Sequence, residues 1–249
     1  MKMNKSNCEK AEMLVEVLPY VNRFRDKIIV IKYGGNAMIN EDLKKAVMQD
    51  LLLMKSVGMH PILVHGGGPA INDMLKKLKV ESHFEQGLRV TDKETMEIVE
   101  MVLAGKVNKD IVGTLNQIGG KGIGLSGKDG NLIQARKKYL EKNGEKIDIG
   151  YVGEVEAVNK EMLESLIYSG YIPVISSIGM GKDGMSYNIN ADYVAGAVAK
   201  AVQANKFILL TDVEGIFRDY HDKDSLISRI TLEDIEALEA DGIISGGMV

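Results

Sequence analysis

Two glycine clusters and a nearby lysine form the pattern in this sequence that best suits the binding of an anion. Lys32 stands two residues before Gly34 and Gly35, and a second cluster, His65-Gly66-Gly67-Gly68, lies further along the chain. Consecutive glycines let backbone N–H groups approach an anion with no Cβ in the way, and the lysine adds a positive charge. Paired glycines are also ordinary turn residues, but together the two clusters favour a phosphate or carboxylate site.

Each cluster follows a short apolar run that is typical of a buried parallel strand. These runs are 27–32 (KIIVIK) and 61–64 (PILV), and helical periodicity follows over 41–56 and up to about Leu78. A repeated strand, glycine turn and helix indicates an α/β fold with a parallel sheet. Ligands of such sheets bind at the carboxyl ends of the strands, where both clusters lie.

The rest of the chain supports the same class of fold. Helices are predicted over 9–22 (with a kink at Pro19), 92–117 (with a break near Ala104 and Gly105), 160–168 and 191–203. Apolar runs at 171–175 and 207–210 predict further strands. Turn signals within 121–158 predict antiparallel strands and hairpins there.

Arg89, Asn188 and Asp192 each have a structural and a functional interpretation. Arg89 is either a solvated surface residue or a bidentate clamp on a carboxylate, just before a helix start marked by the capping-box spacing of Thr91 and Glu94. Another helix start follows the segment Asn188-Ile189-Asn190-Ala191-Asp192, in which Asn and Asp are favoured caps. Alternatively, Asn188 hydrogen-bonds a ligand and Asp192 orients a lysine.

Composition excludes several classes of protein. The 249 residues include one cysteine, no tryptophan and four scattered histidines, without HExxH, GxSxG or a Cys/His set at metal-ligand spacing. Dispersed lysines and few aromatic residues argue against a nucleic-acid platform, and no run of about 20 apolar residues predicts a membrane span. The N-terminus lacks the pattern of an export signal, so we expect a cytoplasmic protein.

The segment 122–127 (GIGLSG) matches the dinucleotide fingerprint GxGxxG and, with Lys128 and Asp129, nearly matches a P-loop. Both motifs need a helix directly after the glycines. A turn, Asp129-Gly130-Asn131, and another strand-like run follow instead. We therefore favour a glycine-rich strand, and an NAD-dependent oxidoreductase stays a minor alternative.

Taken in order, the motifs resemble the amino acid kinase family, most closely its members that phosphorylate N-acetyl-L-glutamate. The matching segments are VIKYGGNAM, ILVHGGGPAI, QGLRVTD, IPVISSIG, YNINAD, LLTDVEGI and ISGGM. The resemblance implies a three-layer αβα sandwich around a mainly parallel sheet, with two lobes. It divides the chain into a helical extension (1–25), a lobe for substrate binding and dimerisation (26–175) and a nucleotide-binding lobe (176–249).

The resemblance also implies a role for each motif residue. Lys32 would bind the transferring phosphoryl group, and Asp192 would orient it. Arg89 would hold the substrate α-carboxylate and Asn188 its α-substituent. Backbone N–H groups for phosphate and for the attacking carboxylate would come from Gly34, Gly35, Gly67 and Gly68. The residues expected near the nucleotide are Ser177, Gly179, Thr211, Asp212 and Gly215, and no side chain is expected to ligate a metal.

The implied cofactor is ATP with Mg²⁺, and the implied partners are N-acetyl-L-glutamate and further copies of the chain. The expected assembly is a dimer, with a hexamer joined through the N-terminal helix as the alternative; neither nucleic acid nor a membrane is an expected partner. The family carries a second lysine shortly after SGGM, and the sequence stops at Val249. The missing lysine leaves open a ligand-binding fragment without full activity. Within the family, a kinase for glutamate, aspartate, carbamate or UMP is the other alternative.

Overall fold

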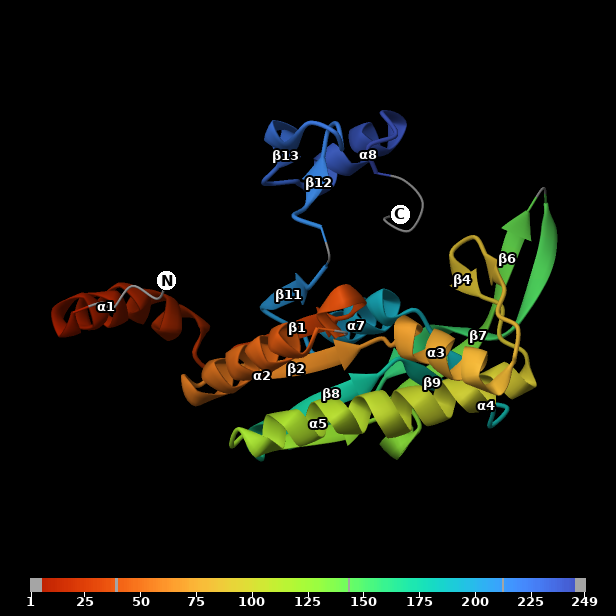
Figure 1. The fold of residues 1–249 in the computed structure, drawn as a ribbon, viewed down its shortest axis with the longest axis horizontal. Helices are drawn as coiled ribbons and strands as arrows, with labels where there is room; N and C mark the ends of the chain where they lie inside the picture. The colour runs from red at the N-terminus through yellow and green to blue at the C-terminus, as the bar shows by residue number, and fades with distance from the viewer. Residues whose placement is uncertain (1–5, 39, 143, 212, 245–249) are drawn as a thin grey trace.

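A five-stranded, all-parallel sheet is the frame of the fold (Figure 1). The computed structural model describes residues 6–38, 40–142, 144–211 and 213–244. In sheet order the strands are β11 (Lys206–Leu209), β1 (Ile28–Tyr33), β2 (His60–His65), β8 (Ile172–Ser176) and β5 (Gly122–Leu125). The apolar runs that predicted strands at 27–32, 61–64, 171–175 and 207–210 are four of these five.

Helices cover both faces of the sheet because alternate residues of each strand point to opposite sides. Ile29 and Ile31 of β1 pack into one apolar cluster, and Val30 packs into the other. The helices on the first face are α2 (Glu41–Ser56), α3 (Gly68–Leu78), α4 (Lys93–Glu100) and α5 (Asn108–Gln117). Those on the second face are α6 (Lys160–Tyr168) and α7 (Ala191–Ala201). The predicted αβα sandwich is confirmed.

The helical pattern over 92–117 does not break near Ala104 and Gly105, contrary to the prediction. A π-helical segment, η2 (Met101–Val107), joins α4 directly to α5. A π turn accommodates an extra residue without ending the helix, and such turns are frequent at functional sites. The glycine therefore lies within a continuous helix.

The region 121–158 is only partly antiparallel. β6 (Ile133–Lys142) and β7 (Glu145–Val158) form the predicted hairpin, and with β9 (Ile178–Gly181) and β10 (Ser186–Asn188) they close a small barrel. β5, however, joins the parallel sheet next to β8. The glycine-rich strand favoured within 122–127 is therefore present, but it is parallel and not part of a hairpin. Glycine is needed there because a Cβ at Gly124 would overlap the side chain of Asn108. No α-helix follows 122–127, which removes the phosphate-loop interpretation.

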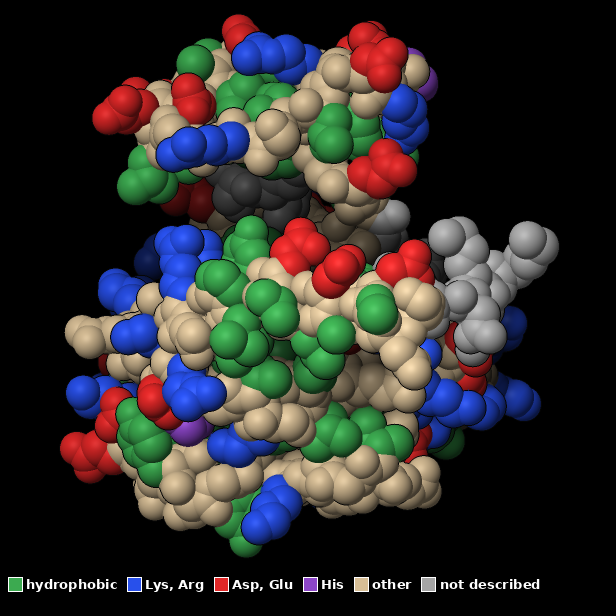
Figure 2. Space-filling view, turned by 90° about the vertical axis from the view of Figure 1, so that its left-hand side faces the viewer, with side chains coloured by type: hydrophobic (Ala, Val, Ile, Leu, Met, Phe, Trp, Pro, Cys, Tyr) green, Lys and Arg blue, Asp and Glu red, His purple; other side chains and the backbone are tan. Residues whose placement is uncertain are grey.

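Two parts of the chain lie outside this sandwich (Figure 1). α1 (Asn7–Phe24) starts at a capping box formed by Ser6 and Glu9, contains Pro19, and buries none of its residues. Figure 2 faces this end of the molecule and shows apolar side chains gathered on it. After β11 come β12 (Ile216–Phe217), β13 (Leu226–Ile227) and α8 (Leu232–Ala240). None of the described helices is long and apolar enough to cross a membrane. The division into lobes at 26–175 and 176–249 stays a prediction.

Candidate active site

Lys32 lies at the carboxyl end of β1, and within the described residues its ammonium pairs with one carboxylate. The Lys32 Nζ is 3.1 Å from Asp192 Oδ1, and the lysine side chain is 17% exposed. The side chain bends over Gly34, where a Cβ would stand 3.1 Å from Nζ. Glycine at position 34 therefore leaves room for the ammonium beside the backbone.

Asp192 is free to hold Lys32 because another residue caps α7. The cap is Asn190, whose Oδ1 accepts a hydrogen bond of 2.8 Å from the backbone N–H of Asp192. The helix cap predicted within 188–192 is therefore confirmed, and it is Asn190, whereas Asn188 and Asp192 do not cap the helix. Their side chains lie against Thr91 and Lys32, respectively.

The glycine cluster after β2 lies beside this ion pair. A Cβ at Gly66 would be 3.4 Å from Cβ of Ala191, the residue next to Asp192, so this loop touches the start of α7. Gly67 packs on η2, where an added Cβ would be 2.5 Å from Leu103 Cδ2. α3 begins at Gly68 without a side-chain cap, and within the described residues the N–H groups of Gly67 and Gly68 donate no hydrogen bond.

The N–H groups of Gly34 and Gly35 are likewise without an acceptor in the described part of the chain. Two sets of unpaired backbone donors and one ammonium therefore meet at the ends of neighbouring strands. Oriented N–H dipoles and a cation are what a phosphoryl group or a carboxylate requires. The structure brings Lys32, Asp192 and both glycine clusters together, as expected from the strand-end argument.

His65, at the end of β2, is fully buried beneath the same loop. Its Nδ1 is 2.7 Å from the carbonyl oxygen of Gly66, and its Nε2 is 3.0 Å from the amide nitrogen of Asn108. Burial lowers the pKa of His65 from 6.5 to about 4, with a smaller contribution from Lys109. The imidazole is therefore neutral in the folded protein.

This burial predicts that stability falls in mild acid. Between about pH 6.5 and pH 4 the unfolded chain binds a proton at His65 that the folded chain does not, so the free energy of unfolding decreases as the pH falls through that window. The loss is on the order of 3 kcal/mol. Urea unfolding at pH 7 and pH 4.5 should show a smaller pH effect in His65→Asn than in the wild type. Substitution of the exposed His83 by Asn should leave the pH effect unchanged.

Arg89 is buried, yet no carboxylate in the described residues pairs with its guanidinium. It ends a small hairpin of β3 (Phe84–Glu85) and β4 (Leu88–Arg89). Its Nη2 donates to Asn72 Oδ1 at 2.6 Å, its Nη1 donates to the hydroxyl of Ser82, and the guanidinium lies 4.6 Å from the centre of the Phe84 ring. Burial lowers the pKa of Arg89. A buried cation held only by neutral acceptors suits an incoming anion.

Thr91 joins the two residues expected to hold the substrate. Its hydroxyl donates to the carbonyl oxygen of Arg89 at 2.8 Å and accepts from Asn188 Nδ2 at 3.3 Å. The capping-box spacing predicts Thr91 as a helix cap, but the cap of α4 is Asp92. The one signal in the sequence was Asp92, which follows Thr91 and is an equally good helix cap. With Asp92 as the cap, the hydroxyl of Thr91 is left to contact Asn188.

Gly150 of β7 fixes the position of Thr91. Its φ is +78°, and a Cβ there would overlap the carbonyl oxygen of Thr91. Gly150→Ala should therefore lower the free energy of unfolding by about 3 kcal/mol or more, because backbone cannot move aside as a side chain can. Gly144 is the matched control: its φ is +82°, but nothing lies within 4 Å of an added Cβ. Gly144→Ala should cost about 1 kcal/mol in the same denaturation experiment. Equal losses would contradict the proposed contact.

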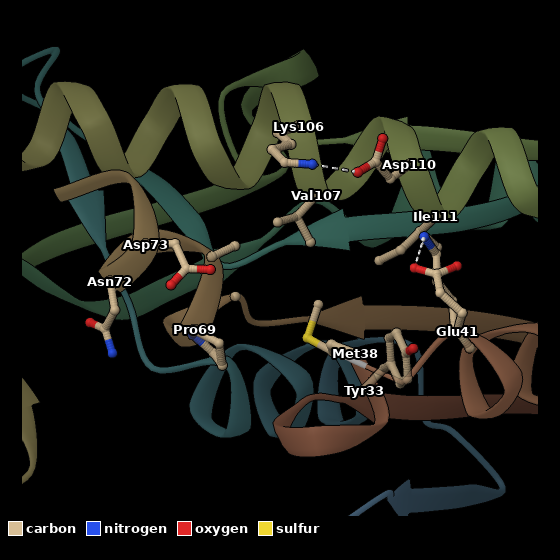
Figure 3. A pocket seen from close by; sticks show the side chains of 13 residues that line it. Tyr33, Met38, Glu41, Pro69, Asn72, Asp73, Lys106, Val107, Asp110 and Ile111 are labelled. Carbon is tan, nitrogen blue, oxygen red and sulfur yellow. Dashed lines mark hydrogen bonds and ion pairs between the residues drawn. The ribbon is translucent and has the colours of Figure 1, made fainter. Parts of the chain in front are cut away.

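A cavity of about 580 Å³ opens beside Gly67 (Figure 3). Pro69, Asn72 and Asp73 of α3 line one side, and Lys106 and Asp110, which form an ion pair of 3.0 Å, face them. Asn72 also accepts the hydrogen bond from Arg89, so the arginine contacts a wall of the cavity, although neither Arg89 nor Lys32 lines it. The end of β1 reaches it through Tyr33, whose pKa is raised to about 12 by burial and by Glu41.

The residues expected near the nucleotide are more scattered. Ser177 is buried, and its carbonyl oxygen accepts from the N–H of Ile189 at 3.0 Å. Gly179 lies inside the barrel, where a Cβ would be 2.7 Å from Ala135 Cβ. Thr211 directly follows Leu210, whose N–H donates to the carbonyl oxygen of Lys32.

Gly215 lies further from this edge, and a Cβ there would be 2.9 Å from the side chain of Leu226. Asp212 and most of the ISGGM segment, residues 245–248, are outside the described residues. Among the residues that the structure describes, no cluster of three or more His, Cys, Asp or Glu could hold a metal ion.

Comparison with known proteins agrees with this arrangement. The profile of the amino acid kinase family matches residues 27–249, and the chain belongs to that family. Acetylglutamate kinase of Heliobacterium modesticaldum is 57% identical over 246 residues, which cover 97% of this chain and 83% of the relative. Acetylglutamate kinase of Desulforamulus reducens is 58% identical over 244 residues, covering 98% and 84%.

A solved structure extends the likeness to the fold. The protein smu.665 from Streptococcus mutans UA159 superposes with a TM-score of 0.74 at 34% identity, covering 89% of this chain and 85% of that one. The resemblance to the family and its implied fold are therefore confirmed. Family membership also makes ATP the expected phosphoryl donor.

Proposed function

We propose that this chain transfers the γ-phosphoryl group of MgATP to the γ-carboxylate of N-acetyl-L-glutamate, giving an acyl phosphate and ADP. The observation that carries the proposal is the meeting of Lys32 with two sets of unpaired glycine N–H groups at the ends of β1 and β2. The identity of 57–58% to acetylglutamate kinases supports the choice of acceptor.

The chemistry needs positive charge and positioning more than proton transfer. A carboxylate is already an anion at neutral pH, so its attack on the γ-phosphorus requires no general base. As the new oxygen–phosphorus bond forms, the bond to the ADP oxygen breaks and its electron pair leaves with ADP. Lys32 and the N–H groups of Gly34, Gly35, Gly67 and Gly68 stabilise the charge on the transferring group. Asp192 keeps the flexible lysine in place.

The acceptor's α-carboxylate would bind Arg89, which lacks a charged partner in the described residues. Asn188 would bind the acetamido group, because both are neutral amides that donate and accept hydrogen bonds. The ammonium of free glutamate would instead face the positive guanidinium. This difference in charge favours the N-acetylated amino acid over glutamate.

Further parts of the proposal rest on the family pattern. The nucleotide contacts would come from Ser177, Gly179, Thr211, Asp212 and Gly215, with Mg²⁺ entering bound to the phosphates of ATP. The lobe of residues 26–175 would form the dimer, and the exposed apolar residues of α1 would join subunits in the alternative hexamer. A cytoplasmic location fits a biosynthetic kinase that uses ATP.

A substrate panel tests the proposed acceptor. ADP release should be measured with MgATP and, in turn, N-acetyl-L-glutamate, L-glutamate, L-aspartate, carbamate and UMP. We expect turnover with N-acetyl-L-glutamate at a kcat/KM at least about 100-fold above the others, since a mispaired charge in a buried site costs several kcal/mol. Equal turnover of glutamate would reject the assignment. Calorimetric binding of N-acetyl-L-glutamate without ADP release would favour the ligand-binding alternative.

A further inference from the structure

One peptide group of the glycine loop is anchored from inside the protein. The carbonyl oxygen of Gly66 lies 2.7 Å from His65 Nδ1 and can only accept, so Nδ1 carries the hydrogen. In a trans peptide the C=O and the next N–H point in opposite directions. Fixing the Gly66 carbonyl toward the core therefore turns the N–H of Gly67 away from the core.

Asn108, the first residue of α5, fixes which nitrogen of His65 is protonated. Its Nδ2 is 3.0 Å from His65 Nε2 and 2.9 Å from the carbonyl oxygen of Val174. Its Oδ1 accepts from Lys109 Nζ at 3.2 Å. The amide nitrogen thus faces the carbonyl oxygens of Val174 and, at 3.5 Å, Leu125, and the amide oxygen faces a donor, so the orientation of Asn108 is unambiguous. Because an amide N–H can only donate, His65 Nε2 carries no hydrogen.

The loop is held on its other side as well. Gly67 packs against Leu103 and Val107 of η2, which leaves no space for a side chain there. Asn108 directly follows η2, so the π-helical segment contacts the loop and also leads into the residue that holds His65. His65 and Asn108 are both fully buried, and neither faces the cavity beside Gly67.

We propose that His65 and Asn108 form a positioning pair that aims the N–H of Gly67 at the transferring phosphoryl group or the attacking carboxylate. The proposal rests on the function proposed above and adds two residues that touch neither substrate. We expect the pair to affect kcat more than KM. An N–H turned by a few tens of degrees loses much of the strength of its hydrogen bond, and this bond would be made only in the transition state.

Two substitutions at His65 test this role. His65→Leu fills the space but removes the donor, whereas the amide of His65→Asn places an N–H near the original Nδ1. We expect kcat to fall about 30- to 100-fold in His65→Leu, with the KM values for MgATP and N-acetyl-L-glutamate within about 3-fold of wild type. His65→Asn should restore kcat to within about 5-fold. Equal losses in two folded variants, or no loss in either, would overturn the proposal.

Asn108→Asp should change the pH dependence of kcat, which a merely structural role of Asn108 would not affect. The carboxylate cannot donate to Nε2, so Nε2 must take a hydrogen, and a neutral ring then turns a bare Nδ1 toward the Gly66 carbonyl. The positioning bond returns only when the ring is doubly protonated. The kcat of this variant should therefore rise as the pH falls, whereas wild type should show no such rise; Lys109 is the charged group that opposes protonation.

Asn116→Asp, on the same helix, is the matched control. Asn116 Oδ1 accepts from the N–H of Gly122 at 2.7 Å, a bond that a carboxylate keeps, so this variant should have the wild-type pH profile. A wild-type profile in Asn108→Asp would overturn the proposal.

The proposed function and the positioning pair are tested by different quantities. Turnover of N-acetyl-L-glutamate by the wild type tests the proposed function, while the ratio of variant to wild-type kcat tests the pair. Independently of activity, NMR of isotope-labelled histidine at neutral pH should show His65 with hydrogen on Nδ1; hydrogen on Nε2 would refute it.

Discussion

Replacing Lys32 with methionine should lower kcat about 100- to 1000-fold, corresponding to about 3–4 kcal/mol of transition-state stabilisation. The Lys32 side chain is only 17% exposed and its ammonium is held by Asp192, so the charge acts in a partly desolvated site at the ends of β1 and β2. Methionine has similar length and no charge, so packing over Gly34 is conserved. The KM values for MgATP and N-acetyl-L-glutamate should change by less than about 5-fold, because charge accumulates mainly in the transition state.

Lys27 provides the control for this substitution. It precedes the opposite end of the same strand and is exposed, so Lys27→Met should retain wild-type kcat and KM. Steady-state ADP release over a range of both substrates measures all three proteins. A near-normal kcat in Lys32→Met would remove this lysine from the phosphoryl site.

Arg89→Ala should raise the KM for N-acetyl-L-glutamate about 100-fold or more, with the KM for MgATP unchanged. A charge-assisted, bidentate contact to a carboxylate is worth about 3 kcal/mol or more. Arg89→Lys retains the charge but loses the fork-shaped pair of donors, and it should give an intermediate KM. Arg136 of β6 is exposed and pairs with Glu154 of β7. Its substitution by alanine is the control and should leave both KM values unchanged.

Stability measurements must accompany Arg89→Ala, because the guanidinium also binds Asn72 and Ser82 inside the protein. A fall in Tm with an unchanged KM for N-acetyl-L-glutamate would show that Arg89 supports only the hairpin. That result would contradict the substrate clamp, while a raised KM in a folded variant supports it.

The sequence predicted the candidate site best where its residues lie at the carboxyl ends of strands. Apolar runs predicted β1 and β2. The rule that parallel sheets bind ligands at the carboxyl ends of their strands then predicted that Lys32 lies beside both glycine clusters. The ion pair between Lys32 and Asp192 agrees with the role suggested for that aspartate. These features follow from the apolar pattern of each strand and from the general topology of parallel sheets, and a single sequence is enough to predict both.

Contacts between distant segments were not predictable. Asn108 is 43 residues from His65, and Thr91 is 97 residues from Asn188, so neither pair leaves a local signal. β5 was predicted as a glycine-rich strand in an antiparallel region and not as a strand of the parallel sheet, because its glycines, needed for close packing with α5, replace the apolar residues that identify a buried parallel strand. The π-helical η2 was taken for a break because one glycine resembles a helix end.

Binding of a transition-state analogue tests the central claim most directly. MgADP with aluminium fluoride and N-acetyl-L-glutamate mimics the transferring phosphoryl group, whereas MgADP alone does not. The account predicts that Lys32→Met weakens binding of the analogue complex about 100-fold and binding of MgADP less than about 3-fold. Equal affinity of wild type and Lys32→Met for the analogue would show that this lysine does not stabilise the charge in transit.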